Sequence, residues 1–426
     1  MLDTRKKIIF YSVFIILICG VFLIFDYFVG LLKPVEAEFP DPRPGLHAVQ
    51  HTTEYTIPIE INSFQLRSPE IDPDSQTRKL FFIGDSFVFG ATVREDEGFT
   101  RRTEYALRAE GLDVDILNLG YVLQSPARYP ARFDRVAEII EPDALVLFIY
   151  ANDITDLDRR SNFERLRARY IRGKAWLNVL HSLLPNTVDA IVSGYMRYSM
   201  ATGDQEHVEN KDPGSKEHFA TFESEDSGLP LEERKQRLIL KLRSMAYLYD
   251  VPEERVRNWL QKHDAILNEV AAGKVPELLV IVGLLRPDNW EICLEIPSSY
   301  EYLWDQLEYN ILELKRRAMK RNIPFAVVYI PSELQFDRRK QDVVRELGYT
   351  VKERWLTETS QLESNLIALS ATEEIPFLNL TPICRKYSDR KMVWDLDLHF
   401  NETGNRLVTP YIAEFVSNLV AADMPE

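Results

Sequence analysis

Cysteine is scarce in this chain of 426 residues, with three in all, at positions 19, 293 and 384. Neither the cysteines nor the seven histidines form a cluster with the spacing of metal ligands, so the sequence predicts no metal site and no cofactor. Cys19 lies within an apolar run. Cys293 and Cys384 either pair in an oxidising compartment or are two buried free thiols, and the sequence does not decide between these states.

Positive charge is also in short supply, because 51 lysines and arginines face 66 aspartates and glutamates, a formal net charge of −15. Nucleic-acid binding needs clustered basic side chains on the phosphates, so this balance argues against a nucleic-acid partner. The acidity alone indicates no more than solubility. Internal repeats are absent.

One long hydrophobic run stands at the N-terminus. Three basic residues at positions 5–7 precede an apolar stretch from 8 to 32 that is broken by Asp26 and small residues. About 20 apolar residues cross a bilayer, so the run predicts an uncleaved single-pass anchor with the rest of the chain extracytoplasmic. A cleaved signal peptide is the alternative. Residues 35–37 loosely fit a cleavage site, but the run exceeds the usual apolar core of about 7–15 residues.

The remaining chain alternates between α/β patterns and charged helical ones. We expect five parts: a cytoplasmic tip and transmembrane anchor over 1–33, a stalk over 34–56, a first α/β part over 57–157, a helical insertion or cap over 158–275, and a second α/β part over 276–426. The insertion contains a polar tract, 202–225, typical of a mobile loop. Its role as packing, substrate lid or partner surface stays open.

Short apolar strands alternate with amphipathic helices in both α/β parts. Strands are predicted at 79–83, 114–119, 144–150, 325–330 and 377–380, and helices at 98–110, 126–140, 300–320 and 403–419. This alternation favours a parallel sheet covered on both faces. Residues 278–285 are expected to form a short strand or another buried segment.

The first predicted strand ends abruptly in Gly84-Asp85-Ser86. Chemistry in open α/β sheets sits outside the carboxyl ends of the strands, so Ser86 is a candidate nucleophile. The competing interpretation is a turn that caps a helix.

Three later segments supply what a nucleophilic serine needs. Of the histidines, only His399 lies in a loop that opens the final helix, which makes it the candidate general base, with Asp397 holding its ring. The amides of Ser86 and Gly120 and the side chain of Asn152 are candidate oxyanion donors. Taken singly, these segments could be helix caps or a satisfied loop network.

Together the four segments resemble the sequence blocks of the SGNH hydrolases, the GDSL esterase/lipase superfamily. The likeness covers 57–155 and about 300–420, and the stretch 61–67 resembles the lead-in of membrane-anchored bacterial members. It implies a flavodoxin-like three-layer α/β/α sandwich with a central parallel sheet. It makes Ser86 the nucleophile and first oxyanion donor, Gly120 and Asn152 the other donors, and His399 the base.

Two positions depart from the family pattern. Tyr150 stands where the third block has glycine, and Leu396 stands where the last block has the aspartate of Asp-x-x-His. Asp397 fits the Asp-x-His variant, which also occurs in members acting on exported polysaccharides, and Asp395 is a second candidate.

The sequence therefore predicts a membrane-tethered serine esterase that works through an acyl-enzyme. The substrate would be an ester, such as an acylated envelope glycan, and either water or a sugar hydroxyl would receive the acyl group. The alternatives are a non-catalytic membrane-anchored scaffold with the same fold and a lipid-active esterase. The acyl chain, the acceptor and the oligomeric state are not predicted.

Overall fold

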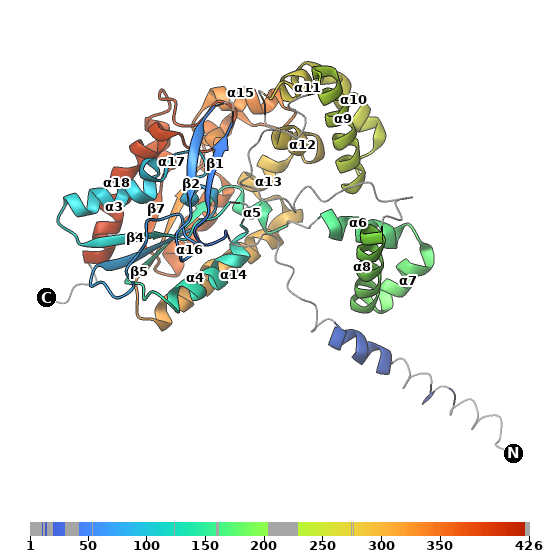
Figure 1. Ribbon diagram of the computed structural model, residues 1–426, viewed down its shortest axis with the longest axis horizontal. Helices are drawn as coiled ribbons and strands as arrows, with labels where there is room; N and C mark the ends of the chain where they lie inside the picture. The colour runs from blue at the N-terminus through green and yellow to red at the C-terminus, as the bar shows by residue number, and fades with distance from the viewer. Residues whose placement is uncertain are drawn as a thin grey trace. The chain divides into compact units, whose positions relative to one another are not determined.

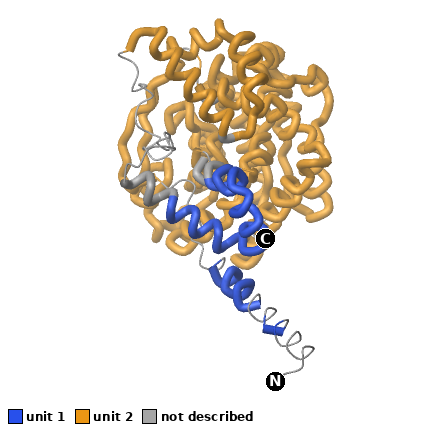
Figure 2. Tube along the Cα trace, turned by 90° about the vertical axis from the view of Figure 1, so that its right-hand side faces the viewer, with its two compact units in different colours: residues 1–38, 160–217 blue, residues 39–159, 218–426 orange. Residues whose placement is uncertain are grey.

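The computed structural model describes residues 11, 13–14, 20–29, 42–52, 54–122, 124–158, 162–202, 229–273, 275 and 277–421. The chain divides into two compact units, one made of residues 1–38 and 160–217 and the other of residues 39–159 and 218–426 (Figure 2).

The larger unit is built on a five-stranded parallel sheet (Figure 1). Its strands are β3 (Arg78–Ile83), β4 (Val114–Asn118), β5 (Ala144–Tyr150), β6 (Phe325–Ile330) and β7 (Phe377–Asn379). Their spatial order is β4-β3-β5-β6-β7. The α/β class with a central parallel sheet is thus confirmed, and the strand order reverses between β3 and β5, where such sheets bind ligands.

Helices cover both faces of this sheet, which explains why every residue of β5 and β6 is buried. The helix α3 (Phe99–Ala109) contacts β4 and the last helix, α18 (Glu402–Ala421), while α14 (Glu301–Lys320) contacts β5, β6 and α4 (Tyr129–Ala137). Continuous apolar runs are the signature of strands buried on both faces.

The other described helices of this unit are α2 (Ser86–Phe89), α5 (Asp153–Asp156), α9 (Leu231–Leu248), α10 (Glu253–Lys262), α11 (Asp264–Ala271), α12 (Glu277–Leu285), α13 (Asn289–Glu295), α15 (Arg338–Glu346), α16 (Gln361–Thr372) and α17 (Thr381–Lys386). The segment 278–285 is therefore helical and not a strand. It is apolar all round, and periodicity alone does not separate such a run from a buried strand. Cys293 and Cys384 are buried free thiols.

A separate two-stranded antiparallel sheet precedes the main one. It pairs β1 (His47–His51) with β2 (Thr56–Glu60). The described residues at the end of the expected stalk, 47–52 and 54–56, thus belong to a hairpin. Its alternating side chains explain the difference, because Ile57 and Ile59 are buried in a small cluster with Phe89.

The smaller unit contains α6 (Asn162–Arg172), α7 (Ala175–Leu183) and α8 (Pro185–Thr202). Its apolar contacts join Ile171, Leu177, Val188 and Val192. The carboxylate of Asp26 accepts the Thr187 N–H at 2.7 Å, near the N-terminus of α8.

No helix among the described residues has both the length and the hydropathy to cross a bilayer. Most of the expected anchor over 1–33 lies outside the described residues, as does nearly all of the polar tract 202–225.

Candidate active site

Ser86 is the first residue of α2, directly after β3 and the Gly84-Asp85 turn. The Asp85 carboxylate caps this short helix by accepting the Phe87 N–H at 2.9 Å. The turn needs glycine at position 84, because a Cβ there would lie 3.0 Å from the Phe148 carbonyl oxygen and closer still to Val88. The sequence thus places the serine hydroxyl at the carboxyl end of the sheet.

The serine meets the predicted histidine and aspartate. Ser86 Oγ lies 2.6 Å from His399 Nε2, and His399 Nδ1 lies 2.5 Å from Asp397 Oδ1. The side chains of His399 and Asp397 are 27% and 24% exposed, so both are partly accessible to solvent. Asp395 is not part of this chain of contacts, since its carboxylate pairs with Lys391 at 2.6 Å.

The surroundings shift both titrating groups of the pair. Burial alone would lower the pKa of His399, but the charge and hydrogen bond of Asp397, together with Asp85 and Glu333, outweigh it and raise that pKa. Burial acts to raise the pKa of Asp397, yet His399 and Tyr55 hold it below its usual value. An ionised Asp397 beside a basic imidazole is what a general base requires.

The loop that carries Asp397 and His399 is held by hydrogen bonds within itself and by one to Thr92, shortly after α2. Val393 and Phe400 form an antiparallel bridge, and the Asn401 amide donates to the carbonyls of Lys391 and Val393 at 2.8 and 3.2 Å. The Thr92 hydroxyl donates to the Phe400 carbonyl at 3.0 Å. The Thr92 bond joins the loop to the segment that follows α2.

The three predicted oxyanion donors differ in their environments. As the first residue of α2, Ser86 has an amide N–H with no acceptor inside the helix. The Gly120 N–H instead donates to Asn118 Oδ1 at 2.9 Å, so it is engaged within the chain. The Asn152 Oδ1 is buried without a hydrogen-bond partner among the described residues. Turning that amide over would place an N–H at the unpaired position.

Gly120 holds the nucleophile helix by close approach. A Cβ at this position would lie 2.3 Å from the Phe89 nitrogen and 2.7 Å from the Val88 carbonyl carbon. The neighbouring Asn118 donates from Nδ2 to the Val88 carbonyl at 2.7 Å. The end of β4 therefore supports α2 directly.

Tyr150, the residue at the glycine position of the third block, fills the space beside the site. Its ring lies 4.2 Å from that of Phe87, and its hydroxyl donates to Glu333 Oε2 at 2.9 Å. Glu333 follows the carboxyl end of β6 and is 1% exposed, and burial raises its pKa to about 7.

Sequence reasoning missed several residues around the site. Glu333 was findable, since it lies three residues beyond a predicted strand. Arg67 lies in the recognised lead-in, and its guanidinium donates to carbonyls at the end of α2, including Phe89 at 3.1 Å. Glu54 and Tyr55 carry no local signal, yet the Tyr55 hydroxyl donates to Asp397 Oδ2 at 2.8 Å.

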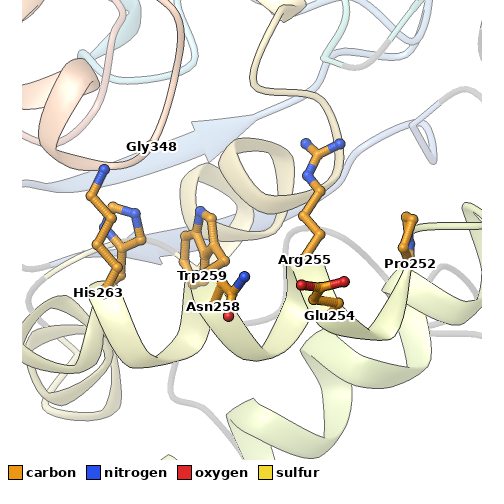
Figure 3. A pocket seen from close by; sticks show the side chains of 8 residues that line it. Pro252, Glu254, Arg255, Asn258, Trp259, His263 and Gly348 are labelled. Atoms are coloured by element: carbon orange, nitrogen blue, oxygen red, sulfur yellow. The ribbon is translucent and has the colours of Figure 1, made fainter.

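A pocket of about 450 Å³ lies elsewhere, on α10 beside Gly348 (Figure 3). It is lined by Trp259, Arg255 and their neighbours, and none of the predicted site residues borders it. Within the described part of the chain, no group of three His, Cys, Asp or Glu side chains is placed to hold a metal ion.

The sequence matches no protein family and no curated protein. Among solved structures, the chain is similar to the crystal structure of a lipase/acylhydrolase from Enterococcus faecalis. The identity is 10%, the match covers 80% of this chain and 96% of that one, and the TM-score is 0.31. A likeness at this level says nothing about activity.

Proposed function

We propose that the protein is a serine hydrolase of ester bonds. The observation that carries this proposal is the unbroken chain of contacts from Ser86 Oγ through His399 to Asp397, at 2.6 and 2.5 Å. A serine, histidine and aspartate in this series of contacts make the serine hydroxyl nucleophilic, whatever the fold around them.

The steps follow from the geometry. His399 Nε2 takes the Ser86 proton as Oγ attacks the ester carbonyl, and Asp397 stabilises the imidazolium that forms. The Ser86 amide stabilises the oxyanion, joined by the Asn152 amide once its N–H faces the site. The Gly120 N–H joins them only if it leaves Asn118. The tetrahedral intermediate collapses to an acyl-enzyme, the alcohol leaves with the proton from His399, and water or a hydroxyl then takes the acyl group.

The proposal extends to an SGNH-type enzyme with a flavodoxin-like three-layer sandwich. The strand order β4-β3-β5-β6-β7 supports it, because it is the 2-1-3-4-5 order of that arrangement. The four sequence blocks also follow β3, β4 and β5 and precede α18, as that family requires.

A membrane-tethered enzyme acting on an acylated envelope glycan is the finer form of the proposal. Exposed side chains in the helical stretch 20–29 support the tether, since Val21, Phe22, Leu23, Ile24 and Phe25 are each more than half exposed. Apolar surface of this kind is costly in water. The Asp-x-His spacing of Asp397 and His399 supports a glycan substrate, because this variant also occurs in family members acting on exported polysaccharides.

Labelling of the purified full-length chain with a fluorophosphonate tests the nucleophile. We expect labelling and hydrolysis of p-nitrophenyl acetate, both abolished by Ser86→Ala and by His399→Ala. The matched control is Ser63→Ala, an exposed serine whose hydroxyl donates to Glu70 at 2.7 Å. A folded wild-type chain that neither labels nor hydrolyses would overturn the proposal in favour of a non-catalytic scaffold.

The acceptor is tested by measuring p-nitrophenol release from p-nitrophenyl esters of different acyl chain length, with and without polysaccharide. Transfer predicts that product forms faster when polysaccharide is present and that the polysaccharide becomes acylated. Hydrolysis predicts no effect of polysaccharide, and a preference for long chains would favour a lipid substrate.

A further inference from the structure

The tip of the β1–β2 hairpin touches the catalytic aspartate. The Tyr55 hydroxyl donates to Asp397 Oδ2 at 2.8 Å, while Asp397 Oδ1 faces His399 at 2.5 Å. One carboxylate oxygen is thus held by the hairpin and the other by the base. A carboxylate fixed at both oxygens keeps the imidazole in one orientation.

The hydrogen bonds give the Tyr55 hydroxyl a direction. Gln50 Nε2 donates to the Tyr55 oxygen at 3.3 Å, so the hydroxyl proton is available for Asp397. Tyr55 is 8% exposed, and burial together with the negative charge of Asp397 raises the pKa of Tyr55. The hydroxyl therefore stays protonated and remains a donor.

Glu54, the neighbour of Tyr55, holds the backbone of the catalytic loop. Its carboxylate accepts the N–H groups of Asp395, Leu396 and Asp397 at 2.6, 2.9 and 2.8 Å. Three successive amides converging on one carboxylate fix the conformation of the segment that carries Asp397.

The same hairpin also packs on the nucleophile side. It is not part of the main sheet, and it shares a separate apolar cluster with Phe89, the last residue of α2. The Tyr55 ring lies 5.2 Å from that of Trp394 in the catalytic loop. One small element thus contacts both α2 and the loop that brings the acid and base.

We propose that Glu54 and Tyr55 are positioning residues of the triad, Tyr55 orienting the Asp397 carboxylate and Glu54 fixing the backbone that presents it. This inference rests on the proposed serine hydrolase function. It makes Glu54 and Tyr55, at the tip of the N-terminal hairpin, a part of the catalytic apparatus.

Kinetics of the full-length chain test the positioning. For Tyr55→Phe we expect kcat to fall about tenfold with KM within about twofold, because binding is untouched while the base is held less well. The acid limb of kcat/KM moves to lower pH, since a carboxylate free to turn away raises the pKa of His399 less. Glu54→Gln lowers kcat in the same way. Glu60→Gln, in the same hairpin, and Tyr309→Phe, an exposed tyrosine, leave kcat unchanged.

A second measurement does not depend on activity. In ¹⁵N-histidine-labelled protein, the downfield Nδ1–H proton of His399, assigned by its loss in His399→Gln, shifts or broadens in Tyr55→Phe and not in the two controls. If the wild type hydrolyses nothing but this proton responds, the proposed function fails and the positioning stands. A folded Tyr55→Phe chain with wild-type kcat and an unmoved proton overturns the positioning. Should Glu54→Gln fail to fold, Tyr55→Phe decides alone.

Discussion

At the scale of single residues, the contacts of each carboxylate decide which one supports His399. Of the three carboxylates of Asp395, Asp397 and Glu333, only that of Asp397 hydrogen-bonds to His399. Asp395 pairs with Lys391, and Glu333 is buried against Tyr150. Position decides the role of each, because all three carry the same functional group.

Asp397→Asn and Asp395→Asn separate two of these roles. We expect Asp397→Asn to lower kcat at least about 100-fold, because the imidazolium loses its stabilising charge. Its residual activity has an acid limb at lower pH, since Asp397 is what raises the pKa of His399. Asp395→Asn leaves kcat and the pH profile of ester hydrolysis unchanged. Equal losses in both variants would contradict the assignment.

Glu333 predicts a pH dependence of stability. Its pKa is raised from 4.5 to about 7 by burial, so the folded state binds the proton more tightly than the unfolded state. The free energy of unfolding therefore falls as pH rises from 4.5 to 7, by about 3 kcal/mol.

Glu333→Gln removes this dependence while keeping a side chain of the same shape. Urea unfolding at pH 5 and pH 7.5 measures it. The wild type loses stability between the two, and the variant loses distinctly less. An unchanged difference between the two pH values in Glu333→Gln would show that other groups cause the loss.

At the scale of elements, the four-residue helix α2 is held from several sides. Asn118 and Gly120 support it from the end of β4, Arg67 binds the carbonyls at its C-terminus, and the hairpin packs on Phe89. Because a helix this short has little stability of its own, tertiary contacts determine the orientation of Ser86.

Gly120→Ala tests this support. The added methyl overlaps backbone atoms of Val88 and Phe89, so α2 must shift, at a cost of about 1–3 kcal/mol in the free energy of unfolding and with a lower kcat. Gly194→Ala is the control, because a Cβ in α8 meets nothing within 4 Å there. Urea unfolding measures the loss of stability, and ester hydrolysis measures the fall in kcat. A Gly120→Ala chain as stable and active as Gly194→Ala would refute the role of Gly120 in supporting α2.

At the scale of the whole molecule, the proposed chemistry lies within one unit. Ser86, Asp397, His399 and the hairpin all belong to residues 39–159 and 218–426. The N-terminal segment belongs to the other unit, with residues 160–217. We therefore expect truncation to separate the proposed tether from the proposed catalysis.

A chain beginning at residue 39 tests the separation. We expect the full-length chain to fractionate with membranes and the truncated chain to remain in the supernatant, with kcat on p-nitrophenyl acetate within about twofold. Ser86→Ala in the truncated chain gives the background rate. A truncated chain that still sediments with membranes would contradict the tether.

The sequence alone determined the α/β class, the parallel sheet and the positions of Ser86 and His399 at its carboxyl edge. Apolar runs and strand ends are local signals, so each strand of the sheet was predicted to within a few residues. The sequence did not identify α12 as a helix, because a run that is apolar on every side has no helical or strand period.

Only the tertiary structure decided which groups complete the site. Tyr55 and Asp397 are 342 positions apart, and the Gly120 N–H is taken by a side chain two residues away. Partners of this kind depend on how distant segments pack and how side chains turn, and no local pattern records either. Ser86 could thus be found in the sequence, while the contacts of the hairpin with the loop that carries Asp397 and His399 are seen only in the tertiary structure.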